Sequence, residues 1–586
     1  MSSTVEVPTR TGGEITTNWL DAFGAALERR DAPAAVALLM PDAWWRDLLA
    51  FTWDLRTLHG HDAMVAMLEE RLEVTAPTGF RLAPGDELTV TDDVVEGFVE
   101  FDTAAARCRG YVRLVRTEDG SWRAHTLLTA MEALHGHEPA AGSRRPKGTR
   151  HGENRGKENW LDERAARRAY TDSDPDVLVV GAGQGGLALG ARLGQLGVDT
   201  LLIERNARIG DNWRNRYHSL VLHDPVWYDH LPYLPFPDHW PVFTPKDKLA
   251  NWFELYADAM ELNVWSGTEF VGGTYDEAES RWTVQVRRGD GTERTLRPAH
   301  VVLATGMSGV AYVPHFAGEE DFAGTLVHSS RHTGGAQYAG KKALVVGSGN
   351  SAHDIAQEFH EHGADVTMLQ RSSTYVMSSE HGIATLFAGL YEEGGPPTAD
   401  ADLIFASIPY PLLGELHRGA TQQIAELDAE LLTGLESRGF ALDYGDDGTG
   451  LFLKYLRRGG GYYIDVGCSE LIAAGKVAVK NGVEIERFTR DGVEFNDGTS
   501  LEADVVVLAT GYQNMRESAR ALLGDAVADR CTPVWGLDEE GELRTMWRRS
   551  GHPGFWFMGG NLNQARHYST FLALQIKAIE EGFLPR

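Results

Sequence analysis

The stretch from Asp176 to Glu204 constrains the fold more than any other part of this chain. It reads DVLVVGAGQGGLALGARLGQLGVDTLLIE: an apolar run, a glycine-rich turn, a helical pattern, a second apolar run and an acidic residue. This order predicts a strand over 177–180, a helix over about 187–196 and a strand over 200–203. The predicted fold class is therefore α/β, with a parallel sheet covered by helices.

The turn between the first strand and the helix has the spacing G-x-G-x-x-G. Gly181 makes the tight turn, Gly183 lets the backbone approach a pyrophosphate, and Gly186 lets the helix pack on the strand. Gly185 lies in the same turn. Glu204, at the end of the second strand, would accept hydrogen bonds from ribose hydroxyls. The segment thus predicts a Rossmann-type dinucleotide site, with the pyrophosphate at the N-terminus of the helix.

A second unit of the same design spans residues 342–371, but it ends differently. Its turn has Ala352 in place of the third glycine, and Arg371 stands where the first unit has Glu204. A carboxylate would repel a 2′-phosphate, whereas arginine binds it bidentately. We therefore expect NADPH here, with NADH as the weaker option. The expected contacts are Gly347, Gly349, Asn350, Ser351, Arg371 and Ser372.

Two units with different ends imply two nucleotides, a tightly held flavin and an exchangeable nicotinamide. An aromatic and proline-rich segment follows the first unit, over residues 213–245, and suits a wall around a flat ring system. We expect the flavin, FAD, in the first unit. The late strand near 505–508 and a helix over 570–581 are expected to complete that unit. The further FAD contacts are Trp213, Thr510, Gly511 and Gly559.

Composition limits the remaining classes of function. A chain of 586 residues predicts two to four domains. The net charge of −29 argues against a nucleic-acid or membrane partner. The three cysteines are far apart, without CxxC, which argues against a disulfide framework, a metal site and a redox dithiol. The chain shows neither a signal pattern at its start nor a run of eighteen apolar residues, so we expect a cytoplasmic protein.

Residues 13–138 change from helical to strand periodicity, an α+β pattern with a hairpin turned at Asp119 and Gly120. This part resembles the NTF2-like or SnoaL-like cone fold, most specifically in WWRDLLAFTWDLRTLHGHDAM. Such cones can hold a ligand, for which Asp47, Trp53, His59 and His61 are candidates. We favour a structural or interface role. Residues 139–172 are expected to be a basic linker, with a short helix from Asn159.

Several segments after the linker carry one family fingerprint. Residues 322–332 read FAGTLVHSSRH, which follows F-x-G-x-x-x-H-S but ends in His332 in place of an aromatic residue. IGDNW at 209–213 and Ala-Thr-Gly at 304–306 and 509–511 are further matches. By these motifs, residues 173–586 resemble class B flavoprotein monooxygenases. The segment YHSLVLHDPVWYDHLPYLPFP is close to the YUCCA type.

The resemblance implies a reaction and a domain plan. NADPH would reduce FAD, O2 would add to it, and a C4a-(hydro)peroxyflavin would oxygenate a small, largely apolar organic substrate. The implied catalytic residues are His223, His328 and His332. The implied domains are FAD-binding over 173–335 and 500–586, and NADPH-binding over 336–499. A helical insert over about 374–461 would line the substrate entrance, with Phe387, Tyr391, Phe405, Tyr410 and Phe440 as candidates. A homodimer is possible in this plan.

Two other functions remain open at this point. One is an NADPH oxidase or electron-transfer reductase that never transfers oxygen. The other is a scaffold that binds a ligand through the NTF2-like part. The substrate is open too, as is the choice between N- or S-oxidation, Baeyer–Villiger oxidation and oxidative decarboxylation.

Overall fold

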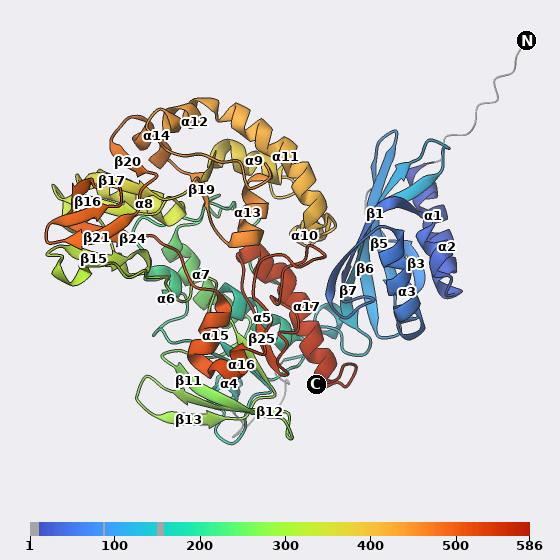
Figure 1. The fold of residues 1–586 in the computed structure, drawn as a ribbon. Coiled ribbons are helices and arrows are strands. Elements are labelled where there is room, and N and C mark those ends of the chain that lie inside the picture. Colours follow the sequence, from blue (N-terminus) through green and yellow to red (C-terminus); the bar gives the residue numbers. More distant parts are fainter. Residues whose placement is uncertain (1–10, 86–87, 149–157) are drawn as a thin grey trace, which may run out of the picture.

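The computed structural model describes residues 11–85, 88–148 and 158–586 (Figure 1). A mostly antiparallel sheet, in which β1 (Leu39–Leu48) and β7 (Trp122–Leu134) pair in parallel, lies at the N-terminal side of the molecule. Two parallel sheets are the largest sheets of the rest. The C-terminal helix α17 (Leu562–Glu580) runs between the N-terminal sheet and the first parallel sheet, and nearly all of its residues are buried. A helix that is buried on all sides is typical of a central packing element.

The first parallel sheet contains the two strands expected over 177–180 and 200–203. Its order is β10-β9-β8-β14-β25, formed by β10 (Asn263–Trp265), β9 (Thr200–Ile203), β8 (Val177–Val180), β14 (His300–Leu303) and β25 (Phe555–Phe557). Helix α5 (Gln184–Gln195) begins three residues earlier than predicted, because Gly183 in the turn is already its N-cap. Helix α7 (Lys246–Ala259) packs beside α5, and an antiparallel sheet follows with β11 (Glu269–Asp276), β12 (Arg281–Arg287) and β13 (Glu293–Leu296).

The second parallel sheet has the order β15-β24-β16-β17-β20. Its members are β15 (Thr325–His328), β24 (Val505–Leu508), β16 (Lys342–Val346), β17 (Asp365–Gln370) and β20 (Val477–Asn481), with helix α8 (Asn350–Glu361) after β16. A small antiparallel sheet, β21 (Ile485–Thr489), β22 (Gly492–Phe495) and β23 (Ser500–Glu502), precedes β24.

This sheet corrects one expectation from the sequence. Strand β24 pairs with β16 and β15, so the segment near 505–508 belongs to the second unit and not to the first. The domain boundaries expected at 335/336 and 499/500 do not match this strand pairing, because they separate β15 and β24 from β16. A four-residue apolar strand carries no information about its partner, because the pairing is decided by packing over the whole sheet. Strand β25 closes the first sheet instead.

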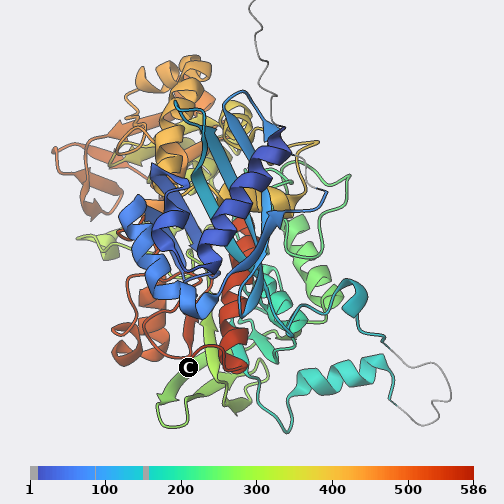
Figure 2. The same cartoon turned by 90° about the vertical axis from the view of Figure 1, so that its right-hand side faces the viewer.

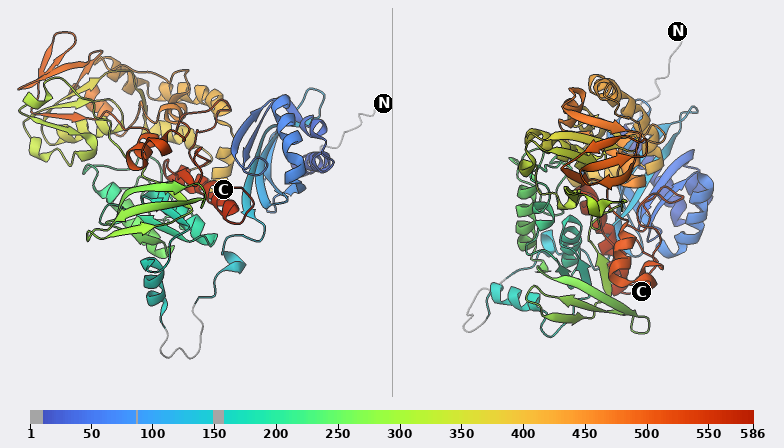
Figure 3. Two further views of the ribbon diagram at one scale, coloured as in Figure 1. Left: turned by 60° about the horizontal axis from the view of Figure 1, so that its bottom comes forward. Right: turned by 60° about the vertical axis from the view of Figure 1, so that its left-hand side comes forward.

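The insert after β17 is helical, as expected. Strands β18 (Tyr375–Ser378) and β19 (Tyr462–Asp465) pair at its base. Its helices are α9 (Ala384–Phe387), α10 (Thr398–Ala406), α11 (Tyr410–Leu427), α12 (Ala429–Glu436) and α13 (Gly450–Arg458). Figure 3 shows these helices extending from the second sheet across to the N-terminal sheet. The insert therefore connects the two ends of the molecule.

The N-terminal part is one curved sheet with helices on a single face. The sheet runs β2-β1-β7-β6-β5-β3, from β2 (Leu55–His59), β1 (Leu39–Leu48), β7 (Trp122–Leu134), β6 (Ala106–Arg116), β5 (Val94–Asp102) and β3 (Thr78–Leu82), with β4 (Thr89–Val90) paired to β5. Helices α1 (Gly12–Glu28), α2 (Ala32–Val36) and α3 (His61–Thr75) cover the face turned away from the rest of the chain (Figure 2). The hairpin between β6 and β7 turns at Asp119 and Gly120, as predicted.

The space between this sheet and its helices is filled by side chains. The buried rings are Trp19, Phe23, Trp45, Phe51, Phe80 and Phe101. The candidate Asp47 accepts hydrogen bonds from Thr129 at 2.7 Å and from Thr52 at 2.7 Å. The candidate His59 stacks on Trp44 at 3.8 Å. These contacts favour the structural role for the N-terminal part.

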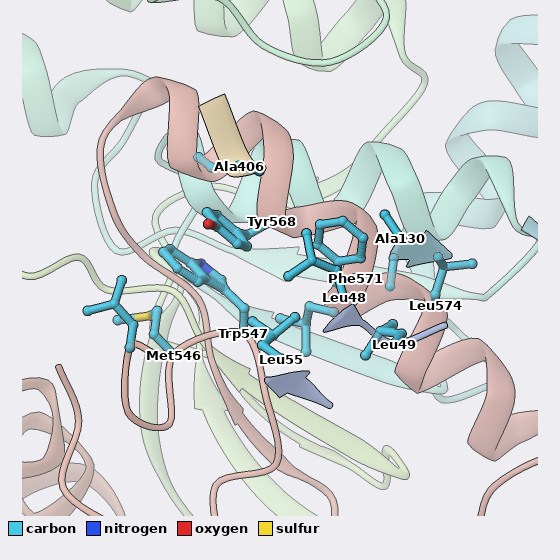
Figure 4. Close-up of a cluster of buried hydrophobic side chains, with 14 of the residues drawn as sticks. Leu48, Leu49, Leu55, Ala130, Ala406, Met546, Trp547, Tyr568, Phe571 and Leu574 are labelled. Atoms are coloured by element: carbon cyan, nitrogen blue, oxygen red, sulfur yellow. The ribbon is translucent and has the colours of Figure 1, made fainter. Parts of the chain in front are cut away.

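The opposite face of the sheet packs on α17 (Figure 4). Leu48, Leu49, Leu55 and Ala130 lie against a second set of side chains, Ala406, Met546, Trp547, Tyr568, Phe571 and Leu574. A contact built from apolar and aromatic side chains is typical of a permanent interface.

The linker contains helix α4 (Trp160–Ala169), where a short helix from Asn159 was expected, and Asn159 is its N-cap. The helix lies along β10 through Arg164 and Asn263. Three basic residues of the linker, Arg144, Arg145 and Lys147, are exposed. Its other basic residues, at positions 150, 155 and 157, lie outside the described residues. Among the described residues, no helix is both long and apolar enough to cross a membrane.

Candidate active site

The first glycine turn is built by two close approaches of the backbone. A side chain on Gly186 would place its Cβ 2.0 Å from the carbonyl oxygen of Gly181, and one on Gly181 would lie 2.5 Å from that of Ala304. Gly181 also has a φ of +110°, which disfavours other residues. Gly183 caps α5 without any side-chain hydrogen bond, so the N–H groups of the first turn point outward. The turn therefore fits a pyrophosphate.

Glu204 lies beside this turn, as expected. Its buried carboxylate accepts hydrogen bonds from the backbone N–H of Ala182 at 3.1 Å and of Asn206 at 2.9 Å. The side chain of Gln184 donates to the carbonyl of Gly560 at 3.3 Å. The segment that holds Gly559 is thereby placed next to the turn.

Helix α17 begins at Leu562, eight residues before the predicted start at 570. Asn561 and Gln564 form a capping box at its N-terminus. The first turns of the helix contain the polar residues Asn563, His567 and Ser569. Hydrophobic periodicity does not predict these turns as part of a buried helix, because buried positions are expected to be apolar.

The second glycine turn repeats the first. Gly347 has a φ of +130°, and a Cβ on it would lie 2.5 Å from the carbonyl oxygen of Ala509. Gly349 caps α8 without a side-chain hydrogen bond. Asn350 accepts a hydrogen bond from the N–H of Ile464 at 2.9 Å, and Ser351 follows it in α8. This turn therefore fits a second pyrophosphate.

Arg371 directly follows β17 and is exposed, as is Ser372. Within the described residues, no hydrogen bond or ion pair holds the Arg371 guanidinium. A free cation thus stands where the sequence predicts a phosphate-binding residue.

Buried polar atoms without a partner lie at the carboxyl ends of both sheets. Within the described part of the chain, no hydrogen bond reaches Trp213 Nε1, Arg216 Nε, Thr305 Oγ1 or Tyr512 OH. A buried polar group left unpaired costs about 1–3 kcal/mol, so such groups mark places that a ligand fills. Ligands of open α/β sheets bind at the carboxyl ends of the strands. Of these four residues, the sequence had singled out Trp213 alone as a site residue.

Two of the predicted histidines have structural partners. His328 Nε2 donates to the carbonyl of Gly511 at 3.1 Å, while its Nδ1 accepts from the N–H of Ser330 at 3.1 Å. Burial lowers the pKa of His328. His332 Nε2 lies 3.2 Å from Glu358 Oε2 of α8, and both side chains are almost fully buried. Among the described residues, no hydrogen bond or ring contact joins either histidine to His223.

His223 lies on the irregular aromatic segment and is half-buried. It acts electrostatically on two carboxyls, those of Asp224 and, from α8, Asp354. Burial raises the pKa of each carboxyl, and His223 opposes this effect. Tyr217 donates to Asp354 at 2.5 Å. His223 is thus placed between the aromatic segment and the second nucleotide unit, and the two aspartates are neighbours that the sequence did not indicate.

A groove and an inner cavity lie between the aromatic segment, the insert and α17. The groove has a volume of about 210 Å³ and includes Trp227, Phe243, Phe387 and Tyr391. Phe387 and Tyr391 pack on Tyr228, which lines the inner cavity. The inner cavity is narrow, about 20 Å³, the space of about one water molecule. Its rings are those of Tyr228, Phe405, Tyr410, Phe452 and Tyr568.

The polar residues of the inner cavity are Asp402, Asn563, Gln564 and His567. Burial would raise the pKa of Asp402, but Arg566 lowers it through hydrogen bonds of 2.7 and 2.8 Å. Burial lowers the pKa of His567 to about 4, and no described residue bonds its buried Nε2. A neutral imidazole is thus free to bond a ligand. Four of the five predicted entrance residues line these spaces, whereas Phe440 packs in the core of the second unit.

Comparisons with known proteins support this arrangement. The profile of the pyridine nucleotide-disulphide oxidoreductase family matches residues 175–394. Indole-3-pyruvate monooxygenase YUCCA1 of Oryza sativa subsp. japonica is 30% identical over 358 residues, which cover 60% of this chain and 80% of that protein. Probable indole-3-pyruvate monooxygenase YUCCA3 of Arabidopsis thaliana is 31% identical over 343 residues, 58% of this chain and 73% of that protein.

Among solved structures, the open crystal structure of cyclohexanone monooxygenase is similar in fold. It has a TM-score of 0.51 and 18% identity, and the match covers 70% of this chain and 88% of that one. The three cysteines here, Cys108, Cys468 and Cys531, are all buried and unpaired, and burial raises the pKa of each. The match to the disulphide oxidoreductase profile therefore reports the shared nucleotide-binding fold and not a thiol chemistry.

Proposed function

We propose that the chain, which belongs to the class B flavoprotein monooxygenases, oxygenates a small, planar and largely apolar substrate that lies in the aromatic groove and reaches the inner cavity beside Tyr228 with one polar group. It is an NADPH- and O2-dependent enzyme with FAD as its flavin. When bound, FAD takes electrons from NADPH and activates O2 for transfer of one oxygen atom to the substrate. The chain's own residues bind, orient and enclose the reactants.

The first turn, with Gly181, Gly183, Gly185 and Gly186, would hold the FAD pyrophosphate. Glu204 would hold its ribose, and the unpaired groups of Trp213 and Thr305 lie at the same edge of the sheet. Gly559 would contact FAD from the start of α17.

NADPH would bind at the second turn, through Gly347, Gly349, Asn350 and Ser351. The free guanidinium of Arg371, with Ser372, would take the 2′-phosphate. Thr510 and Gly511 were expected to contact FAD. Because they follow β24 of the second sheet, they would contact NADPH instead. Arg216 and Tyr512 supply unpaired donors at this edge.

The histidines have different roles in this proposal. His223, beside Asp224 and Asp354, would donate or accept a hydrogen bond where the two cofactors meet. His328 would position Gly511, and His332 would anchor the segment before β16 to α8. A rigid aromatic enclosure around the reactants keeps water out of the site.

The observation that carries the substrate proposal is the unpaired Nε2 of His567 in a cavity where five aromatic rings line the wall. Because the inner cavity has room for about one water molecule, flat rings would lie in the larger groove against Trp227, Phe387 and Tyr391, and His567 would bond one small polar group of the substrate. The curated relatives are named for indole-3-pyruvate, an aromatic ring with a keto acid side chain. Indole-3-pyruvate is therefore the first candidate.

The test is substrate-stimulated NADPH oxidation and O2 uptake by the FAD-loaded protein. Indole-3-pyruvate is compared with indole-3-lactate, which carries a hydroxyl in place of the keto group. We expect stimulation and an oxygenated product with the keto acid alone, and a raised KM in His567→Phe. Equal stimulation by both compounds, or none by either, would contradict this substrate.

The fold of residues 13–138 supports an NTF2-like interpretation, because helices cover one face of a strongly curved sheet. We propose 13–138 as this module and 139–172 as its linker. The first nucleotide unit then comprises 173–324 and 509–586, and the second 325–508 with the insert. The homodimer and the cytoplasmic location stay predictions.

A further inference from the structure

Arg46, on strand β1, is a fully buried cation that reaches out of its own sheet. Its side chain is 1% exposed. The guanidinium makes a bidentate pair with Glu542, at 2.6 Å from Nε and 2.8 Å from Nη2. Thr57 of β2 donates to the same carboxylate at 2.7 Å. The N-terminal sheet is therefore joined to the C-terminal part of the chain by a buried charge pair.

The remaining contacts of Arg46 all go to residues of the inner cavity. Nη1 donates to the carbonyl of Ala406 at 3.0 Å, and Nη2 donates to the hydroxyl of Tyr568 at 2.9 Å. The guanidinium also lies over the ring of Tyr410, 4.6 Å from its centre. Ala406, Tyr410 and Tyr568 line the inner cavity. One side chain of the N-terminal sheet, which does not itself line the cavity, thus contacts three of the residues that do.

These contacts fix positions. The hydroxyls of Tyr410 and Tyr568 are 2.8 Å apart, and Tyr568 stacks on Trp547 at 4.1 Å. The planar guanidinium offers its donors in fixed directions, which lysine cannot reproduce. A buried ion pair contributes little net stability against an apolar replacement, so its clearest effect here is to specify geometry. In a narrow cavity, small shifts of these rings change what fits.

We propose that the N-terminal module completes the substrate cavity, with Arg46 as the positioning residue that holds Tyr410 and Tyr568 in its wall. This inference rests on the proposed function, in that the inner cavity receives the polar group of the substrate. The module is then part of the monooxygenase and not an independent ligand-binding scaffold.

The chain offers a matched control for Arg46. Arg56, on the neighbouring strand β2, makes the same bidentate pair with Glu540, at 2.6 and 2.5 Å, but its side chain is 35% exposed and contacts no cavity residue. Arg46→Lys and Arg56→Lys in the full chain therefore each remove one bidentate arginine–glutamate pair from the same interface. Thr57→Val, which weakens the hold on Glu542 alone, is the milder variant should Arg46→Lys not fold.

Hydrogen exchange followed by mass spectrometry is the first readout, and it needs no substrate. In Arg46→Lys we expect faster exchange in α10, the start of α11 and the part of α17 around Tyr568, with α5 unchanged. Arg56→Lys should match the wild type in all of these segments. Unchanged exchange in the cavity segments of Arg46→Lys, or equal change in both variants, would overturn the proposal.

Kinetics with indole-3-pyruvate is the second readout. Arg46→Lys should raise its KM roughly 5- to 30-fold and increase the peroxide released per NADPH, while the KM for NADPH and the FAD content stay as in wild type. Normal KM with altered exchange would overturn the link to substrate binding. If wild type itself ignores indole-3-pyruvate, the substrate proposal fails, and the exchange experiment alone decides the positioning role.

Discussion

The imidazole of His328 donates a hydrogen bond from Nε2 to the carbonyl oxygen of Gly511, 3.1 Å away. The bond joins the ends of β15 and β24 at the carboxyl edge of the second sheet. Because Nδ1 accepts from Ser330, both ring nitrogens are engaged. The fingerprint histidine of this family therefore holds backbone in place and has no free nitrogen for proton transfer.

Replacement of His328 should thus act on NADPH binding. His328→Leu removes the side-chain bond to the Gly511 carbonyl, which keeps the Tyr312 N–H as a donor at 2.9 Å. The turn loosens, so the KM for NADPH should rise roughly 5- to 30-fold, with unchanged FAD content. His328→Gln, which keeps an amide donor, should recover part of the loss. Exposed His362 in the same unit is the control as His362→Gln. A changed pH profile at saturating NADPH would contradict a purely positional role.

Gly186→Ala should abolish FAD binding. The added Cβ would lie 2.0 Å from the carbonyl oxygen of Gly181, and neither backbone can move without opening the turn. Gly194→Ala, in the same helix, meets no atom within 4 Å and should raise stability by about 0.5–1 kcal/mol. The flavin absorbance of the purified variants and their urea midpoints are the measurements. Full FAD content in Gly186→Ala would disprove the assignment of the turn.

Arg371→Ala should lower the preference for NADPH over NADH about ten- to a hundredfold, since one charge-assisted hydrogen bond contributes ~1.5–3 kcal/mol. The change should appear in kcat/KM for NADPH, with little effect on NADH. Arg487, an arginine of the same unit that pairs with Glu494, is the control. An unchanged ratio would show that another group reads the phosphate.

Buried histidines should make stability depend on pH. Burial lowers the pKa of His417 to about 4, whereas the unfolded chain protonates near 6.5. Between these values the unfolded state holds more protons, so the free energy of unfolding falls as pH falls, by at most about 1.4 kcal/mol per pH unit. His417→Phe should therefore gain on wild type between pH 6.5 and 4 in urea unfolding. Exposed His239→Phe should not, and a constant difference across this range would refute the effect.

Much of the fold was readable from local patterns. The strands at 177–180 and 200–203 lie where predicted, because buried parallel strands appear as short apolar runs bounded by glycine and acid. The partner of β24 and the start of α17 were not predictable, since both depend on contacts with distant segments. The two glycine turns were predictable from the spacing of their glycines. The same glycines allow the close backbone approaches that make both turns fit a pyrophosphate.

The substrate cavity was beyond reach of the sequence for a related reason. Asp402 and Arg566 form an ion pair although they are 164 residues apart in the sequence. Arg46 and Glu542 form another, with a separation of 496 residues. Each residue alone resembles an ordinary surface charge, and no local spacing connects them. His567 is equally inconspicuous, and its importance comes from burial without a partner.

The most direct test of the account is the fate of the oxygen atom. The FAD-loaded full chain is given NADPH, indole-3-pyruvate and ¹⁸O2, and both the organic product and hydrogen peroxide are quantified. The account predicts one ¹⁸O atom in the product for each NADPH consumed, with little peroxide. Consumption of NADPH with all of the label in peroxide, for this and other small aromatic substrates, would contradict oxygen transfer and make the protein an oxidase.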